Sequence, residues 1–201
     1  GGMYEPDEGE IYIRGEKVKI NSPNHAAKLN IGMVHQHFKL VPDYTITENI
    51  ILGVEPIKKF AGLFPYVDIR NANHKIEELS KKFGLEVDAT KVIADLTVSM
   101  QQRVEILKVL YREAEILIFD EPTAVLTPQE IEFLLNIIKG LRDAGKTIIL
   151  ITHKLEEIKK VADRCAVLNK GRLVKVLDVK NTSVNHMARL MVGREVSFEA
   201  A

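Results

Sequence analysis

The stretch that most constrains this chain is residues 116–123, Ile-Leu-Ile-Phe-Asp-Glu-Pro-Thr. Four consecutive apolar residues predict a short strand buried on both faces of a parallel sheet. Two adjacent carboxylates, Asp120 and Glu121, follow at the C-terminal end of that strand, where open α/β sheets place their ligands. An isolated Asp-Glu pair is more often a solvated strand end, and the buried run before it favours the functional interpretation. We therefore expect Asp120 to hold Mg²⁺ and Glu121 to take a proton from an attacking water molecule.

Three further segments surround this pair in the chain. They are residues 32–38 (Gly-Met-Val-His-Gln-His-Phe), 96–105 (Leu-Thr-Val-Ser-Met-Gln-Gln-Arg-Val-Glu) and 148–153 (Ile-Ile-Leu-Ile-Thr-His). With the carboxylate strand, they resemble the Q-loop, signature motif, switch histidine and Walker B motif of the ATP-binding cassette (ABC) ATPases, in the same order. The Val-His-Gln-His-Phe run and the tail Met-Val-Gly-Arg-Glu at 191–195 are similar to the N-terminal cassette of the importer branch for nucleosides and simple sugars.

The resemblance implies roles for individual residues. Glu121 would be the general base, and His153 would contact the γ-phosphate and orient the attacking water. Gln36 would reach the water and share Mg²⁺ with Asp120. The signature residues would close over the nucleotide of a partner cassette: Thr97, Val98, Ser99 and Gln101. The implied cofactors are ATP and Mg²⁺.

Ser99 departs from the family, which has a glycine at this position. Glycine lets a phosphate approach the backbone closely, whereas serine adds a Cβ and a hydroxyl. Residues 99–102, Ser-Met-Gln-Gln, also form a capping pattern, so Ser99 has the alternative interpretation of the residue that caps the signature helix. In both interpretations the positive end of a helix would face the γ-phosphate.

The phosphate-binding loop of such enzymes, G-x-x-x-x-G-K-[ST], has a textual match at residues 140–147. A true loop follows a strand and opens a helix, whereas here a predicted helix precedes the match and an apolar strand follows it. We therefore interpret Gly145 and Lys146 as ordinary residues at a helix end. In the family the true loop lies just upstream of the segment matching residues 2–10. We expect a partial cassette without the N-terminal strand and Walker A loop, in which ATP binding is weak or absent.

The coarse pattern predicts an α/β fold of the P-loop NTPase type, with a mainly parallel sheet because helix and strand alternate over residues 99–161. Residues 11–20 predict an antiparallel hairpin, and residues 54–66 have a loop-like composition. By resemblance, residues 1–201 would be one partial nucleotide-binding domain in which residues 48–113, approximately, form a helical subdomain.

Composition limits the possible partners. Lys and Arg total 28, as do Asp and Glu, and this neutral balance argues against a nucleic-acid partner. No apolar run approaches the ~18 residues of a spanning helix, and the single Cys165 fits a buried thiol in a reducing compartment. The resemblance implies a peripheral protein at the cytoplasmic face of the membrane, with transmembrane permease subunits and a second cassette as partners. Two alternatives are a non-catalytic cassette fragment that only docks, and a soluble ABC ATPase acting on DNA or ribosomes.

Overall fold

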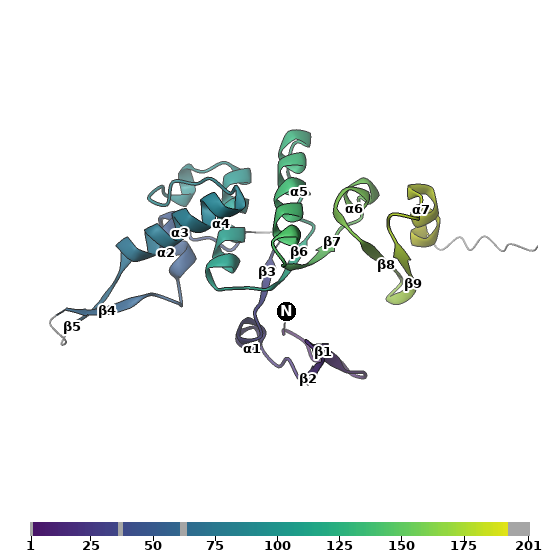
Figure 1. The fold of residues 1–201 in the computed structure, drawn as a ribbon, viewed down its shortest axis with the longest axis horizontal. Coiled ribbons are helices and arrows are strands. Elements are labelled where there is room, and N and C mark those ends of the chain that lie inside the picture. The colour runs from purple at the N-terminus through teal and green to yellow at the C-terminus, as the bar shows by residue number, and fades with distance from the viewer. Residues whose placement is uncertain (1, 36–37, 61–63, 193–201) are drawn as a thin grey trace, which may run out of the picture. The chain divides into compact units, whose positions relative to one another are not determined.

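The computed structural model describes residues 2–35, 38–60 and 64–192, and the chain divides into two compact units, residues 1–149 and 150–201. Figure 1 traces the elements of both units. Within the described ranges, no helix combines the length and the apolar composition that crossing a bilayer requires.

The first unit holds most of the elements. They are β1 (Ile11–Ile13), β2 (Glu16–Val18), α1 (Pro23–Lys28), β3 (Ile31–Val34), α2 (Ile46–Ile51), β4 (Ile57–Phe60), β5 (Phe64–Val67), α3 (Ile69–Phe83), a 3₁₀ turn (Ile93–Asp95), α4 (Val98–Tyr111), β6 (Ile116–Asp120) and α5 (Pro128–Asp143). The boundary between the units falls within β7 (Thr147–Ile151).

The main sheet has the strand order β3-β6-β7. Strands β3 and β6 are parallel, in a register that pairs Ile31 with Ile116 and Val34 with Phe119. Parallel strands end at the same edge of a sheet, so the segment that follows β3 begins beside Asp120. The predicted α/β class with a parallel sheet is confirmed, and so is the antiparallel hairpin, which β1 and β2 form.

The expectation that the carboxylate strand is buried on both faces is wrong for the described structure. Leu117 and Phe119 are fully buried, whereas Ile116 and Ile118 are only partly covered. Alternate side chains of a strand point to opposite faces, so the described residues pack closely against only one face of β6.

Gly32 allows helix α4 to pack directly against β3. A Cβ added at Gly32 would lie 2.8 Å from Cβ of Val109 and 2.9 Å from Cβ of Ala114. Neither of these atoms can rotate away, because a Cβ is fixed to its backbone. Glycine at this position therefore sets how closely α4 can approach the sheet.

The loop-like interpretation of residues 54–66 is wrong. Strands β4 and β5 form an antiparallel hairpin in which Lys59 pairs with Pro65. Proline cannot donate a backbone hydrogen bond to a neighbouring strand, so its presence argued against a strand in the sequence. A two-stranded sheet has only edge strands, however, and proline is tolerated there. The next helix, α3, ends as predicted at Gly84, whose φ of 65° is left-handed. The extent of a helical subdomain stays a prediction.

Two predicted capping boxes are confirmed. Thr45 begins α2, where its backbone N–H donates to Glu48 Oε2 at 2.8 Å and its hydroxyl accepts from Glu48 N at 3.2 Å. Thr127 and Glu130 make the same reciprocal pair at the start of α5. The order of elements around residues 140–147 is also as predicted, since α5 precedes the textual match and β7 follows it.

The second unit contains α6 (Leu155–Val161), β8 (Arg164–Asn169), β9 (Arg172–Asp178) and α7 (Val184–Val192). Strands β8 and β9 pair antiparallel. Their inward side chains join the two helices in one apolar cluster: Ile158, Val167, Leu177, Val179 and Met187. Cys165 lies half-buried against this cluster, and burial raises the pKa of its thiol.

Candidate functional site

The two candidate carboxylates lie where the sheet ends. Asp120 is the last residue of β6 and is half-buried. Glu121 follows with a φ of 44°, in the left-handed region, and its Oε2 atom is buried. Residues other than glycine rarely adopt this conformation, and the residue before a proline is normally extended. The backbone at Glu121 is therefore held in an unfavourable geometry by its surroundings.

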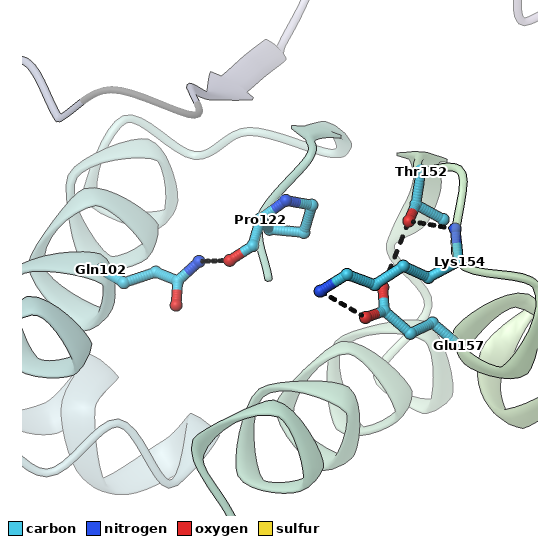
Figure 2. Close-up of polar contacts among 5 residues, drawn as sticks. All are labelled: Gln102, Pro122, Thr152, Lys154 and Glu157. Atoms are coloured by element: carbon cyan, nitrogen blue, oxygen red, sulfur yellow. Dashed lines mark hydrogen bonds and ion pairs between the residues drawn. The ribbon is translucent and has the colours of Figure 1, made fainter. Parts of the chain in front are cut away.

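Helix α4 contacts the backbone directly after Glu121. Nε2 of Gln102 donates to the carbonyl oxygen of Pro122 at 2.5 Å (Figure 2). Gln102 is 4% exposed, and Pro122 and Thr123 are also buried. The hydrogen bond is thus shielded from water, where an unpaired amide or carbonyl would be costly.

The end of β3 lies beside the carboxylates. His35 directly follows β3 and is half-buried, and burial lowers the pKa of its imidazole, as does the nearby charge of Lys39. Glu105 and Asp120 oppose that shift of the His35 pKa, so both acidic side chains lie near the ring. The predicted Mg²⁺ ligand Gln36 lies outside the described residues, and its role stays a prediction.

Buried polar side chains hold the backbone of residues 39–41, which follow in the chain. Lys39 N donates to Oε1 of Glu105 at 2.9 Å, and Glu105, on α4, is 3% exposed. Val41 exchanges two hydrogen bonds with the buried side chain of Asn49 on α2, at 2.7 and 3.1 Å. Helices α2 and α4 therefore hold residues 39–41 from two elements.

The candidate signature residues occupy the N-terminal end of α4. Thr97 is the N-cap, with φ −63° and ψ 159°, and its hydroxyl accepts from Met100 N at 3.3 Å. Ser99 lies inside the first turn, so its interpretation as the cap is wrong. The helix begins two residues earlier, because Thr97 has both the extended backbone and the hydroxyl that a cap needs.

The other two signature candidates differ in their surroundings. Val98 is 44% exposed at the start of the helix. The side chain of Gln101 bends back, and its Nε2 donates to the carbonyl oxygen of Leu96 at 3.1 Å. Gln101 therefore already has a structural role at this helix end.

His153 belongs to the second unit, in the bend between β7 and α6, and is exposed. A network around buried Glu157 holds the residues on either side of it (Figure 2). Thr152 Oγ1 donates to Glu157 Oε2 at 3.3 Å and accepts from Lys154 N at 3.1 Å. Lys154 Nζ lies 3.5 Å from Glu157 Oε1. The turn that presents His153 is therefore well defined.

Sequence reasoning missed the buried polar residues that hold these segments: Gln102, Glu105, Asn49 and Glu157. A signal for two of them was present in α4. Gln102 and Glu105 share the helix with a dense set of buried apolar residues, and a polar side chain buried in such surroundings is expected to bind a specific partner. The sequence did not reveal which backbone groups they bind.

The residues at the sheet edge fit Mg²⁺ in one manner only. Mg²⁺ is commonly held by one or two carboxylates together with nucleotide phosphates and water. Asp120 supplies one half-buried carboxylate, and among the described residues no group of three or more His, Cys, Asp or Glu side chains converges. A single carboxylate of this kind fits a Mg²⁺ ion whose other ligands are nucleotide phosphates and water.

The fold and the site define an α/β protein whose candidate residues lie at the C-terminal edge of parallel strands, where open α/β sheets bind their ligands. The chain belongs to the ABC transporter family, whose sequence pattern matches residues 1–124. It is 56% identical to the guanosine import ATP-binding protein NupO of Bacillus subtilis and 53% identical to the nucleoside import ATP-binding protein NupA of Lactococcus lactis. Each match covers 98% of this chain and 38% of the relative, so the chain spans less than half the length of these relatives.

Solved structures agree on the fold. The ADP form of the ATP-binding cassette MJ1267 has a TM-score of 0.76 at 19% identity, over 96% of this chain and 76% of that chain. The cassette cbiO1 from Clostridium perfringens has a TM-score of 0.73 at 24% identity, over 98% of this chain and 75% of that chain. The predicted ABC cassette fold is thus confirmed.

Proposed function

We propose that the protein containing this chain binds and hydrolyses ATP, with Asp120 and Glu121 at the centre of the reaction. The observation that carries the proposal is the position of this pair. Asp120 ends a parallel strand and Glu121 directly follows it, at the edge where β3 also ends. This is the edge at which open α/β sheets bind ligands, and in-line hydrolysis of a phosphate needs both a charge-holding and a water-positioning group there.

In this proposal the residues act as follows. The carboxylate of Glu121 accepts a hydrogen bond from the attacking water and takes its proton as the water bonds to the γ-phosphorus and the bond to ADP breaks. Asp120 and Gln36 would hold Mg²⁺, and the bound ion would supply positive charge that stabilises the β- and γ-phosphates. The contact of His153 with the γ-phosphate is implied by the family resemblance alone and stays a prediction. Glu121 acts on the water as a general base, with no covalent intermediate.

The residues at the start of α4 would serve a nucleotide on a partner cassette. The N–H groups of the first turn, of which Met100 N already donates to Thr97, and the positive end of a 14-residue helix favour an anion at Thr97, Val98 and Ser99. The first turn carries no acidic residue that would repel a phosphate. Gln101 donates one N–H of its side-chain amide to the Leu96 carbonyl, and its second N–H and Oε1 could contact a nucleotide.

We further propose that the whole protein drives import of a nucleoside or a simple sugar, together with permease subunits and a second cassette at the membrane. The support is the sequence identity of 53% and 56% to two nucleoside and guanosine import proteins, over nearly the full chain. The neutral charge of the chain also disfavours a nucleic-acid partner.

Replacing the candidate base tests the hydrolysis proposal. In a protein that carries residues 1–201 together with a phosphate-binding loop, Glu121→Gln removes the proton acceptor and keeps the shape of the side chain. We expect ATP hydrolysis to fall about 10²-fold or more while ATP affinity stays unchanged. Equal turnover by the variant and the parent would remove Glu121 from the role of base.

Reconstitution tests the transport proposal. In vesicles that contain the permease subunits and a cognate binding protein, guanosine or adenosine should stimulate ATP hydrolysis, and Glu121→Gln should abolish uptake of labelled nucleoside. Stimulation by ribose or glucose instead would assign the sugar branch. Stimulation by DNA or ribosomes, without permease subunits, would refute the importer.

A further inference from the structure

We propose that Gln102 is a positioning residue for Glu121, an inference that rests on the proposed hydrolytic function. Glu121 is left-handed at φ 44° and precedes a proline. Both features disfavour its conformation, so neighbouring contacts have to stabilise it.

The hydrogen bond from Gln102 acts directly after the strained residue. Its Nε2 atom donates to the carbonyl oxygen of Pro122 at 2.5 Å, and that carbonyl belongs to the peptide immediately C-terminal to Glu121 and its proline (Figure 2). Because Pro122 has no N–H, the carbonyl is the remaining backbone group through which this residue can be held by a hydrogen bond. The Pro122 carbonyl lies in the peptide between Pro122 and Thr123, one peptide beyond the bond that joins Glu121 to its proline. Because the proline ring fixes φ of Pro122, holding this carbonyl also restrains the preceding peptide, which begins at Glu121.

Gln102 is well suited to this role because it is itself immobile. It is 4% exposed, and it lies on α4 among fully buried neighbours such as Val104 and Ile106. The helix is anchored at the sheet by the close approach of Val109 to Gly32. Gln102 therefore ties the backbone beside the carboxylates to a helix that is itself fixed by packing. A supporting residue preserves the geometry of a reacting group in this manner.

Gln102→Met tests this role, because methionine has a similar volume and cannot donate. In a protein that carries residues 1–201 with a phosphate-binding loop, we expect kcat for ATP to fall about tenfold or more, because small displacements of a reacting group are costly. The KM for ATP should stay within about twofold. The control is Gln129→Met, the same change at an exposed site in the first turn of α5, which should leave kcat unchanged.

A double-variant cycle separates this inference from the proposed function. If Gln102 acts through Glu121, Gln102→Met should cause less than about a twofold further loss when Glu121→Gln is already present. A Glu121→Gln variant with full activity would overturn the proposed base itself. A slow Glu121→Gln variant beside an unaffected Gln102→Met variant would overturn only the positioning role, as would equal losses from Gln102→Met in both backgrounds.

Gln102→Glu provides a second measurement that is independent of how well the methionine variant folds. An ionised carboxylate cannot donate to the Pro122 carbonyl, whereas the protonated acid can. The ratio of the variant's kcat to that of the parent should therefore rise as the pH is lowered towards the pKa of the introduced carboxyl. A ratio that is constant between pH 8 and pH 5 would contradict a role that depends on this hydrogen bond.

Discussion

Gly32→Ala should destabilise the first unit, and the structure sets the size of the effect. The new Cβ would lie 2.8 Å from Val109 Cβ, 2.9 Å from Ala114 Cβ and 3.1 Å from Val109 Cγ1. Carbon atoms pack best at about 3.5–4.0 Å, so two of these contacts are too short by roughly 0.6 Å or more. Relief requires movement of α4 away from β3, because the clashing Cβ atoms cannot rotate.

Such overpacking typically costs about 1–3 kcal/mol of unfolding free energy. Gly140→Ala is a matched control in the same unit. Gly140 lies within α5, and a Cβ there would meet nothing within 4 Å. Alanine is favoured over glycine inside a helix by roughly 0.5–1 kcal/mol, so this variant should be more stable than the parent.

Urea unfolding of the 201-residue chain, followed by far-UV circular dichroism, measures both changes. Both glycines belong to the first unit, so the same transition reports on both. For a chain of this size, each kcal/mol corresponds to about 2–4 °C in melting temperature, which offers an independent measure. A Gly32→Ala variant as stable as Gly140→Ala would refute the close packing of α4 on β3.

Two further comparisons address the start of α4 and the core of the second unit. Thr97→Ala should lower the unfolding free energy by about 1 kcal/mol, because it removes the cap of α4, whereas Ser99→Ala should change it little. If Ser99→Ala were the more destabilising of the two in the same urea assay, Ser99 would be the cap. Met187→Ala should cost the second unit about 2–5 kcal/mol, because Met187 is fully buried in its apolar cluster. Val192→Ala, at a residue that is 71% exposed, is the control, and equal hydrogen-exchange protection of α6 in both variants would contradict the cluster.

Local patterns were sufficient for the elements whose signals come from neighbouring residues. Thr45 with Glu48, and Thr127 with Glu130, predicted two helix starts because a capping box involves residues only three positions apart. Gly84 predicted the end of α3 because a left-handed residue there is a local requirement. In the same manner, the order of helix and strand around Gly145 excluded a phosphate loop despite the matching letters.

The errors arose where distant residues decide the structure. The β4–β5 hairpin was missed because Pro65 is acceptable only when its strand is an edge, which depends on the number of strands in that sheet. The Ser99 error is of another kind, because the deciding residue is a near neighbour: Ser99 was a reasonable cap by its residue type, but Thr97 satisfies the same requirement two residues earlier. The burial of Ile116 and Ile118 depends on which elements cover each face of the sheet, and a run of four apolar letters does not contain that information.

The candidate site shows the same difference between features set by neighbouring residues and features set by distant ones. Asp120, Glu121 and His153 could be proposed from the sequence because each lies within two residues of the end of an apolar strand, and the end of a strand is a local feature. Gln102 is separated from Pro122 by 20 positions, and Lys39 from Glu105 by 66, so their hydrogen bonds follow from the packing of α4 against the sheet. A buried glutamine or glutamate in an otherwise apolar helix indicates that a polar partner exists, since leaving it unpaired would cost about 1–3 kcal/mol. The tertiary structure then identifies that partner, which in this chain is the backbone at Lys39 for Glu105 and at Pro122 for Gln102.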